Sequence, residues 1–94
     1  MNKINLPVIE LLCGLAEECG ELTQAALKLR RAYDQTNPTP IDKERAYDDF
    51  CEEIADVQLY LDQIPYNKKF VNEIKEKKLI RWRNRLEAKE EETA

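Results

Sequence analysis

Two groups of acidic residues interrupt stretches that are otherwise apolar with helical spacing. The first lies in GLAEECGELTQAAL and the second in CEEIADVQLYL. Each group holds two carboxylates three residues apart, which places both on one face of a helix. These pairs are Glu18 with Glu21 and Glu53 with Asp56. Carboxylate oxygens gathered in this way are ligands for a hard divalent cation. The sequence therefore predicts a metal site built from two helices.

Helical phase decides which glutamate of each adjacent pair points inward, because neighbouring residues differ by about 100°. Glu18 continues the apolar stripe of its helix, whereas Glu17 lies among polar residues. In the same way Glu53 continues the second apolar stripe and Glu52 does not. We therefore predict that Glu18 and Glu53 face each other between two antiparallel helices.

Carboxylates placed between two helices need a positive charge, because burying each one alone costs several kcal/mol. Mg²⁺ fits best, since it binds through a few carboxylates and keeps waters that a phosphate ligand can displace. Mn²⁺ is the natural substitute. The competing interpretation is that these glutamates are solvated, or form ion pairs with Lys28, Arg30 and Arg31 on the helix surface.

Three helices are predicted to position these residues, because apolar residues recur every three or four positions over about 8–31, 42–63 and 68–88. Asp42 is a predicted N-cap, and Pro65 ends the second helix. The segment YDQTNPTP, residues 33–40, is a predicted loop, and the acidic tail over 89–94 is predicted to be disordered. The fold class is all-α: a helical hairpin plus a third helix, completing a four-helix-bundle-like assembly on oligomerisation.

The composition describes a single small helical domain spanning residues 1–94. It is 43% hydrophobic and 36% charged with only two glycines, which is typical of a soluble helical protein. A chain of this length builds a modest core and gains from a partner, so we expect a homodimer or homotetramer. The net charge of −4 argues against binding to nucleic acid polymers or membrane surfaces.

The residue types that are absent narrow the possible chemistry. The sequence contains no histidine, which excludes Ser-His and Cys-His nucleophilic machinery and most zinc sites. Cys13, Cys19 and Cys51 lack CxxC spacing and are predicted to be reduced core residues. Neither a signal peptide nor a transmembrane run is recognisable, so we expect a cytoplasmic protein.

The two acidic motifs, EECGE and EEIAD, resemble the EExxE and ExxD signature of MazG-like nucleotide pyrophosphohydrolases. These enzymes are a branch of the all-α NTP pyrophosphatase superfamily. The flanking GLAEECGELTQAALK and ADVQLYL, and the order and length of the two long helices, agree with this resemblance. Carried over by position, it implies a catalytic set whose metal ligands are Glu18, Glu21, Glu53 and Asp56, with Glu17 in a supporting role.

The resemblance also implies an activity, the Mg²⁺-dependent cleavage of the α–β bond of nucleoside triphosphates to a monophosphate and pyrophosphate. The segment KEKKLIRWRNRL looks similar to the family's nucleotide-binding C-terminal segment. Its cations lie near one face of the third helix and could bind the triphosphate. These cations are Lys77, Lys78, Arg81 and Arg85. Tyr60 and Asn84 are candidates for contacting the base, whereas Trp82 is predicted to lie in the core or a dimer contact.

Three alternatives remain open on the sequence. Phosphoribosyl-ATP pyrophosphatase has the same fold and similar motifs. A catalytically silent interaction protein would place the carboxylates around a dimer interface, and it would bind no Mg²⁺ and be strongly stabilised at low pH. A non-catalytic nucleotide-binding regulator would use the same ligands as the enzyme and leave the triphosphate intact.

Overall fold

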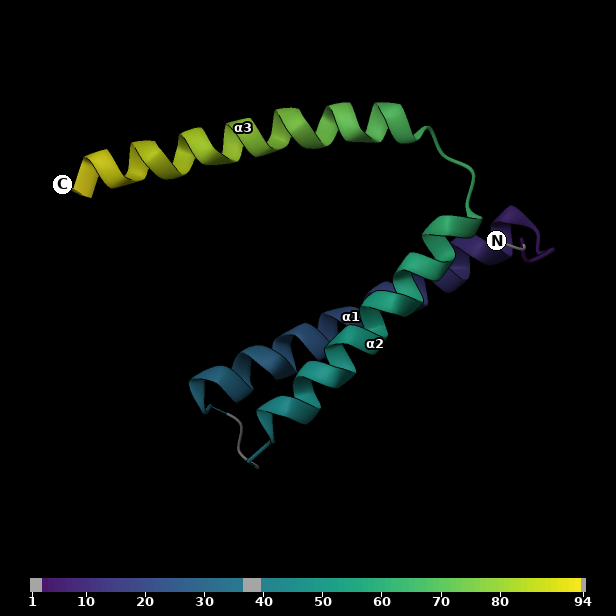
Figure 1. Ribbon diagram of the computed structural model, residues 1–94, viewed down its shortest axis with the longest axis horizontal. Helices are drawn as coiled ribbons and strands as arrows, with labels where there is room; N and C mark the ends of the chain where they lie inside the picture. Colours follow the sequence, from purple (N-terminus) through teal and green to yellow (C-terminus); the bar gives the residue numbers. More distant parts are fainter. Residues whose placement is uncertain (1–2, 37–39, 94) are drawn as a thin grey trace.

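Three helices make up the part of the chain that the computed structural model describes, residues 3–36 and 40–93 (Figure 1). They are α1 (Val8–Asp34), α2 (Lys43–Gln63) and α3 (Lys68–Thr93). Over these residues there is no β-strand. The all-α prediction, with a hairpin followed by a third helix, is confirmed.

The ends of the helices follow local capping chemistry. α1 begins directly after Pro7, whose fixed φ and missing N–H suit a helix start. Its C-cap is Gln35, which has a left-handed φ of 62°. α2 begins directly after its N-cap Asp42, whose carboxylate accepts a hydrogen bond from the backbone N–H of Glu44 at 3.1 Å. It ends two residues before Pro65. The predicted cap at Asp42 is confirmed.

Two boundaries differ from the predictions. α1 continues to Asp34, so the loop predicted over 33–40 begins at Gln35, and its residues 37–39 lie outside the described ranges. α3 continues to Thr93, so the prediction of a disordered tail over 89–94 is wrong for residues 89–93, and residue 94 is not among those described. The reason is intrinsic propensity, because alanine, lysine and glutamate all favour a helix.

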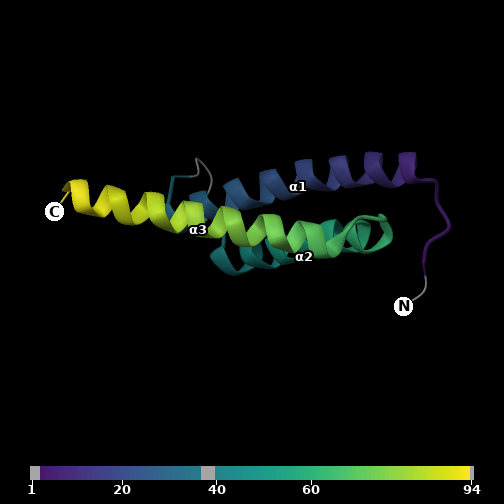
Figure 2. The ribbon, with the colours of Figure 1, turned by 90° about the horizontal axis from the view of Figure 1, so that it is seen from above.

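α1 and α2 lie side by side as an antiparallel hairpin (Figures 1 and 2). In each helix the residues facing the other helix are spaced alternately four and three apart, and all are buried or half-buried. In α1 they are Leu11, Leu15, Glu18, Leu22, Ala25, Leu29 and Ala32. In α2 and at its C-cap Ile64 they are Ala46, Phe50, Glu53, Val57, Tyr60 and Ile64. We call these two rows the seam, and a glutamate lies near the middle of each row.

The two ends of the seam are packed differently. Near the loop, Leu29, Ala32 and Ala46 form a buried cluster, against which Phe50 packs. Near the other end, a Cβ at Gly14 would overlap the Tyr60 ring. Glycine thus lets α1 approach Tyr60 closely, and the carboxylates lie between these two contacts.

The two glycines of the chain provide a matched test of this contact. Gly14→Ala is expected to lower the free energy of unfolding by about 1–3 kcal/mol, because the added methyl group meets the Tyr60 ring. Gly20→Ala is expected to raise it by about 0.5–1 kcal/mol, because alanine favours a helix interior and, beyond the adjacent residues and backbone of α1 itself, no described atom lies within 4 Å of the added Cβ. Urea unfolding of both variants measures the difference; equal effects would contradict the contact.

α3 stands apart from the hairpin (Figure 1). Among the described residues, no α-carbon of α3 lies within 8 Å of one in α1 or α2. The radius of gyration is 17.7 Å, whereas a compact chain of this length would have about 12 Å. Apolar side chains of α3 are therefore exposed, including Trp82 at 58%. The prediction that Trp82 lies in the core is wrong for the single chain, and the predicted dimer contact remains a prediction.

The three cysteines are exposed and form no disulfide. The prediction that they are core residues is therefore wrong for this chain. The reason is helical phase, since Cys13 and Cys19 of α1 and Cys51 of α2 all lie off the seam. Their apolar neighbours in sequence are partly exposed as well, for example Leu12 at 49%.

Candidate metal centre

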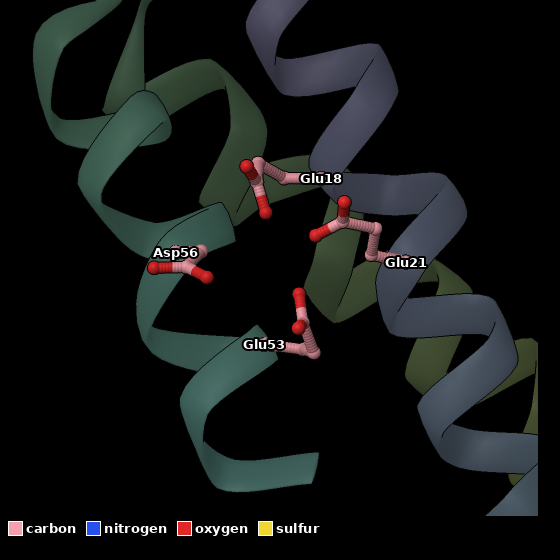
Figure 3. Close-up of side chains that lie close together, drawn as sticks. All are labelled: Glu18, Glu21, Glu53 and Asp56. Atoms are coloured by element: carbon pink, nitrogen blue, oxygen red, sulfur yellow. The ribbon is translucent and has the colours of Figure 1, made fainter. Parts of the chain in front are cut away.

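Four carboxylates converge between α1 and α2 (Figure 3). Glu18 and Glu21 project from α1, and Glu53 and Asp56 project from α2. One oxygen of each residue lies within 4.8 Å of one oxygen of every other. We call this set the carboxylate cluster. The structure thus brings together the four residues that helical phase selected.

The members of the cluster differ in exposure. Glu18 and Glu53 lie on the seam and are half-buried, as is Asp56, whereas Glu21 is exposed. The Oε2 atoms of Glu18 and Glu53 are buried and have no hydrogen-bond partner within the described ranges. A buried carboxylate oxygen without a partner is costly, because it has lost water and gained nothing in return. These two atoms are therefore suited to coordinate a cation.

Burial and mutual repulsion change the acidity of the cluster. Burial, followed by the negative charge of Glu21 and a hydrogen bond with it, raises the pKa of Glu18 to about 6. Burial, followed by the charges of Glu21 and Asp56, also raises the pKa of Glu53. Without a cation Glu18 and Glu53 thus retain protons more readily than isolated glutamates do, and a divalent cation relieves the same repulsion.

This raised pKa predicts how the stability of the metal-free protein depends on pH. Burial and the neighbouring charges raise the pKa of folded Glu18 to about 6, above the 4.5 of an isolated glutamate, so the folded state binds more protons than the unfolded state in this range. Its contribution to the free energy of unfolding is fully present below about pH 4.5 and is lost as the pH rises through about 6.

Thermal unfolding of the protein in EDTA, from pH 4.5 to 8, compared with Glu18→Gln, measures this contribution. The wild-type protein is expected to lose stability relative to the variant as the pH rises through the window. With saturating Mg²⁺ the loss should disappear, because the cation requires the ionised carboxylates. A constant difference between the two proteins in EDTA would contradict a raised pKa at Glu18.

Glu17, for which we predicted a supporting role, lies outside the carboxylate cluster. Its side chain is exposed on α1, as its polar neighbours in the helical phase indicated. Tyr60, predicted to contact the base, is half-buried one turn beyond Asp56 and packs over Gly14. Of these two residues, only Tyr60 belongs to the seam that holds the cluster.

An apolar pocket beside Tyr60 was not anticipated from the sequence. Its volume is about 210 Å³. Its lining residues are Ile4, Leu6, Leu11, Leu59, Tyr60 and Gln63. The backbone N–H of Ile4 donates a hydrogen bond to Oε1 of Gln63 at 2.8 Å, which holds the N-terminal segment against α2. The only sequence signal was an apolar pair, Ile4 and Leu6, ahead of the first helix.

The nucleotide-binding residues predicted on α3 lie away from the cluster. Lys77, Lys78, Arg81, Asn84 and Arg85 are all exposed, on a helix that does not approach α1 or α2 in the described part of the chain. Within the described part of one chain they make no contact with the helices of the cluster, so their role in binding the triphosphate stays a prediction. The physical reason is the short connection between α2 and α3, which directs α3 away from the hairpin (Figure 1).

Comparisons of the chain with protein-family models, curated proteins and solved structures found no match. None of the helices in the described ranges is both long and apolar enough to cross a membrane. The function is therefore inferred from the geometry of the carboxylate cluster and of the residues around it.

Proposed function

We propose that this protein is a Mg²⁺-dependent nucleoside triphosphate pyrophosphohydrolase, which cleaves the α–β phosphate bond to give a nucleoside monophosphate and pyrophosphate. The observation that carries the proposal is the carboxylate cluster. Its oxygens come from two helices and lie within 4.8 Å of one another, and two of its buried oxygens have no hydrogen-bond partner in residues 3–36 and 40–93. The resemblance of EECGE and EEIAD to the MazG-like signature supports the same activity.

The residues fit a hard cation better than any other ligand. The cluster offers only carboxylate oxygens, which suit Mg²⁺ or Mn²⁺, and the chain has no histidine to favour zinc. Glu18 and Glu53 would hold the ion from the seam, and Glu21 and Asp56 from one turn away. When bound, Mg²⁺ supplies charge to the phosphate oxygens and lowers the pKa of a coordinated water.

The reaction consumes one water, which attacks phosphorus while the bond to the leaving pyrophosphate breaks. Without histidine, the proton acceptor must come from other side chains, and the carboxylates of the cluster lie closest to the proposed reaction centre. The chain's own role is thus to hold the cation and to remove the proton.

The apolar pocket is a site for the base or sugar of the substrate. Tyr60 lines this pocket and follows Asp56 by one helical turn, so the pocket and the carboxylate cluster are neighbours along α2. An aromatic ring with aliphatic neighbours can stack against a base, and the amide of Gln63 can form hydrogen bonds to it. This arrangement suits a nucleotide, which has an apolar face at one end and phosphates at the other.

A product assay tests the proposal. The purified protein is incubated with Mg²⁺ and a panel of ribo- and deoxyribonucleoside triphosphates, together with phosphoribosyl-ATP. Monophosphate and pyrophosphate are separated from diphosphate and phosphate. We expect monophosphate and pyrophosphate from at least one nucleoside triphosphate. Diphosphate and phosphate would overturn the bond assignment, turnover of phosphoribosyl-ATP alone would favour that pyrophosphatase, and binding without turnover would favour a regulator.

A further inference from the structure

The N-terminal segment ahead of α1 forms one wall of the apolar pocket beside Tyr60. It runs past the end of the hairpin where α1 begins and α2 ends (Figure 2). The side chains of Ile4 and Leu6 both line the pocket. The backbone N–H of Leu6 donates to the carbonyl of Ile4 at 3.1 Å, so the chain makes a tight turn at this wall. Specific hydrogen bonds therefore position the segment against the pocket.

The pocket has the size and lining expected for a flat heterocycle. Four of its six lining residues are aliphatic, and only Tyr60 and Gln63 carry polar side-chain atoms. Ile4, Leu6 and Leu59 are 43–57% exposed around it, so a planar ring placed there would cover apolar surface. The volume of about 210 Å³ is below the roughly 300 Å³ at which sites enclose a whole drug-sized ligand. The pocket thus suits the base alone and leaves the phosphates outside.

The hydrogen bond between the N-terminal segment and Gln63 fixes the orientation of the Gln63 amide. The backbone N–H of Ile4 lies 2.8 Å from Oε1 of Gln63. A backbone N–H can only donate, so the atom that it faces must be the amide oxygen and cannot be the NH₂ group. The oxygen is thus engaged by Ile4, and the NH₂ group is the half of the amide left for a ligand. Gln63 therefore offers the pocket a hydrogen-bond donor.

A donor at this position separates two classes of base. Uracil, thymine and guanine carry an exocyclic keto oxygen, which accepts a hydrogen bond. Cytosine and adenine carry an amino group at the corresponding position, which donates one. Two donors that face each other leave both groups unsatisfied, and this costs binding free energy. The orientation of the Gln63 amide therefore favours a keto base.

We infer that Gln63, oriented by the backbone N–H of Ile4, selects nucleotides with a keto base over nucleotides with an amino base. In this arrangement Gln63 contacts the base, and Ile4 is a positioning residue that acts through Gln63. The inference rests on the proposed function, since it assigns the base of the triphosphate whose phosphates bind at the carboxylate cluster. Tyr60 joins the two ends of the site, because it lines the pocket one helical turn after Asp56.

Reversing the polarity of residue 63 tests the inference. Gln63→Glu keeps an oxygen for the N–H of Ile4 and replaces the NH₂ group with an acceptor of nearly the same shape. The ratio of kcat/KM is measured for UTP against CTP and for GTP against ATP, so each pair is matched in ring number and sugar. In the pair that it hydrolyses faster, the wild type should favour the keto member by about tenfold or more. Gln63→Glu should lower that ratio by about tenfold or more.

The comparison within a pair removes the general effect of the added charge, because a carboxylate repels both triphosphates equally. Gln58→Glu is the matched control, since it makes the same chemical change at an exposed position of α2 outside the pocket. It should keep the wild-type ratio. Circular dichroism verifies that both variants are helical. A ratio that changes equally in Gln58→Glu and Gln63→Glu would overturn the role of Gln63.

A variant at Ile4 tests the positioning role of the N-terminal segment. Ile4→Pro removes the backbone N–H that holds the Gln63 oxygen, so the amide can turn either way to meet a donor or an acceptor. The keto-to-amino ratio should fall toward one while turnover is retained. Ile4→Val, which keeps the N–H and an aliphatic side chain, should keep the wild-type ratio. An unchanged ratio in Ile4→Pro would overturn the positioning role.

Binding of monophosphates separates this inference from the proposed function, because it requires no turnover. Calorimetry compares the affinities of UMP with CMP and of GMP with AMP, for the wild type and for Gln63→Glu. If the wild type hydrolyses triphosphates with equal kcat/KM within each pair, or prefers the amino member, the inference is overturned while the proposed function stands. If no triphosphate is hydrolysed, the proposed function fails and the affinities decide. Tighter binding of the keto member that is lost in Gln63→Glu supports the selection, and equal affinities or no binding overturn it.

Discussion

Glu53→Gln is expected to lower nucleotide hydrolysis about a thousandfold or more, and at the same time to stabilise the metal-free fold at neutral pH. The two effects have opposite signs for one reason. Glu53 lies at a seam position where an apolar residue would pack, and its buried Oε2 has no partner in the described part of the chain. A neutral amide removes the repulsion with Glu21 and Asp56, but it cannot replace a charged metal ligand.

The measurements are turnover with saturating Mg²⁺ and thermal unfolding in EDTA at pH 7.5. Glu52→Gln is the matched control, because it makes the same chemical change one residue away, on an exposed position off the seam. That variant should keep turnover within about twofold and leave the unfolding temperature nearly unchanged. Loss of activity together with loss of stability in Glu53→Gln would point to a structural role for the carboxylate, and would contradict a metal-binding one.

Removal of divalent cations is expected to abolish turnover completely and to destabilise the protein at neutral pH. On the proposed function Mg²⁺ would bind only the folded cluster, because the unfolded chain cannot gather four carboxylates within 4.8 Å. At a Mg²⁺ concentration one hundred times its dissociation constant, the free energy of unfolding should rise by about 2.7 kcal/mol. Turnover and unfolding are measured in EDTA and after stepwise addition of Mg²⁺.

Ca²⁺ separates binding from catalysis in this experiment. It also prefers oxygen ligands, but it is larger and accepts irregular geometry, so it should restore stability without restoring turnover. The Glu53→Gln variant should show little stabilisation by either ion. Full turnover in EDTA would contradict the proposed mechanism, and equal stabilisation of wild type and Glu53→Gln by Mg²⁺ would locate the metal elsewhere.

The sequence by itself determined the helices and the residues that meet across the hairpin. Apolar residues every three or four positions define the seam, and the same periodicity separates Glu18 from Glu17 and Glu53 from Glu52. These features are local, because the direction of each side chain follows from its position within one helix. Convergence of the carboxylate cluster then required only that the two helices pack antiparallel, which a short loop favours.

Only the tertiary structure decided which side-chain atoms are buried, which are exposed and where the pocket lies. Three features depend on which segments touch: the buried Oε2 atoms of Glu18 and Glu53, which have no hydrogen-bond partner among the described residues, the pocket beside Tyr60, and the exposure of Trp82. Helical periodicity does not determine such contacts, since the direction of α3 is set by the backbone dihedral angles of a few residues around Pro65. Apolar side chains of α3 such as Trp82 are exposed in this chain, and no periodicity along the sequence specifies that exposure.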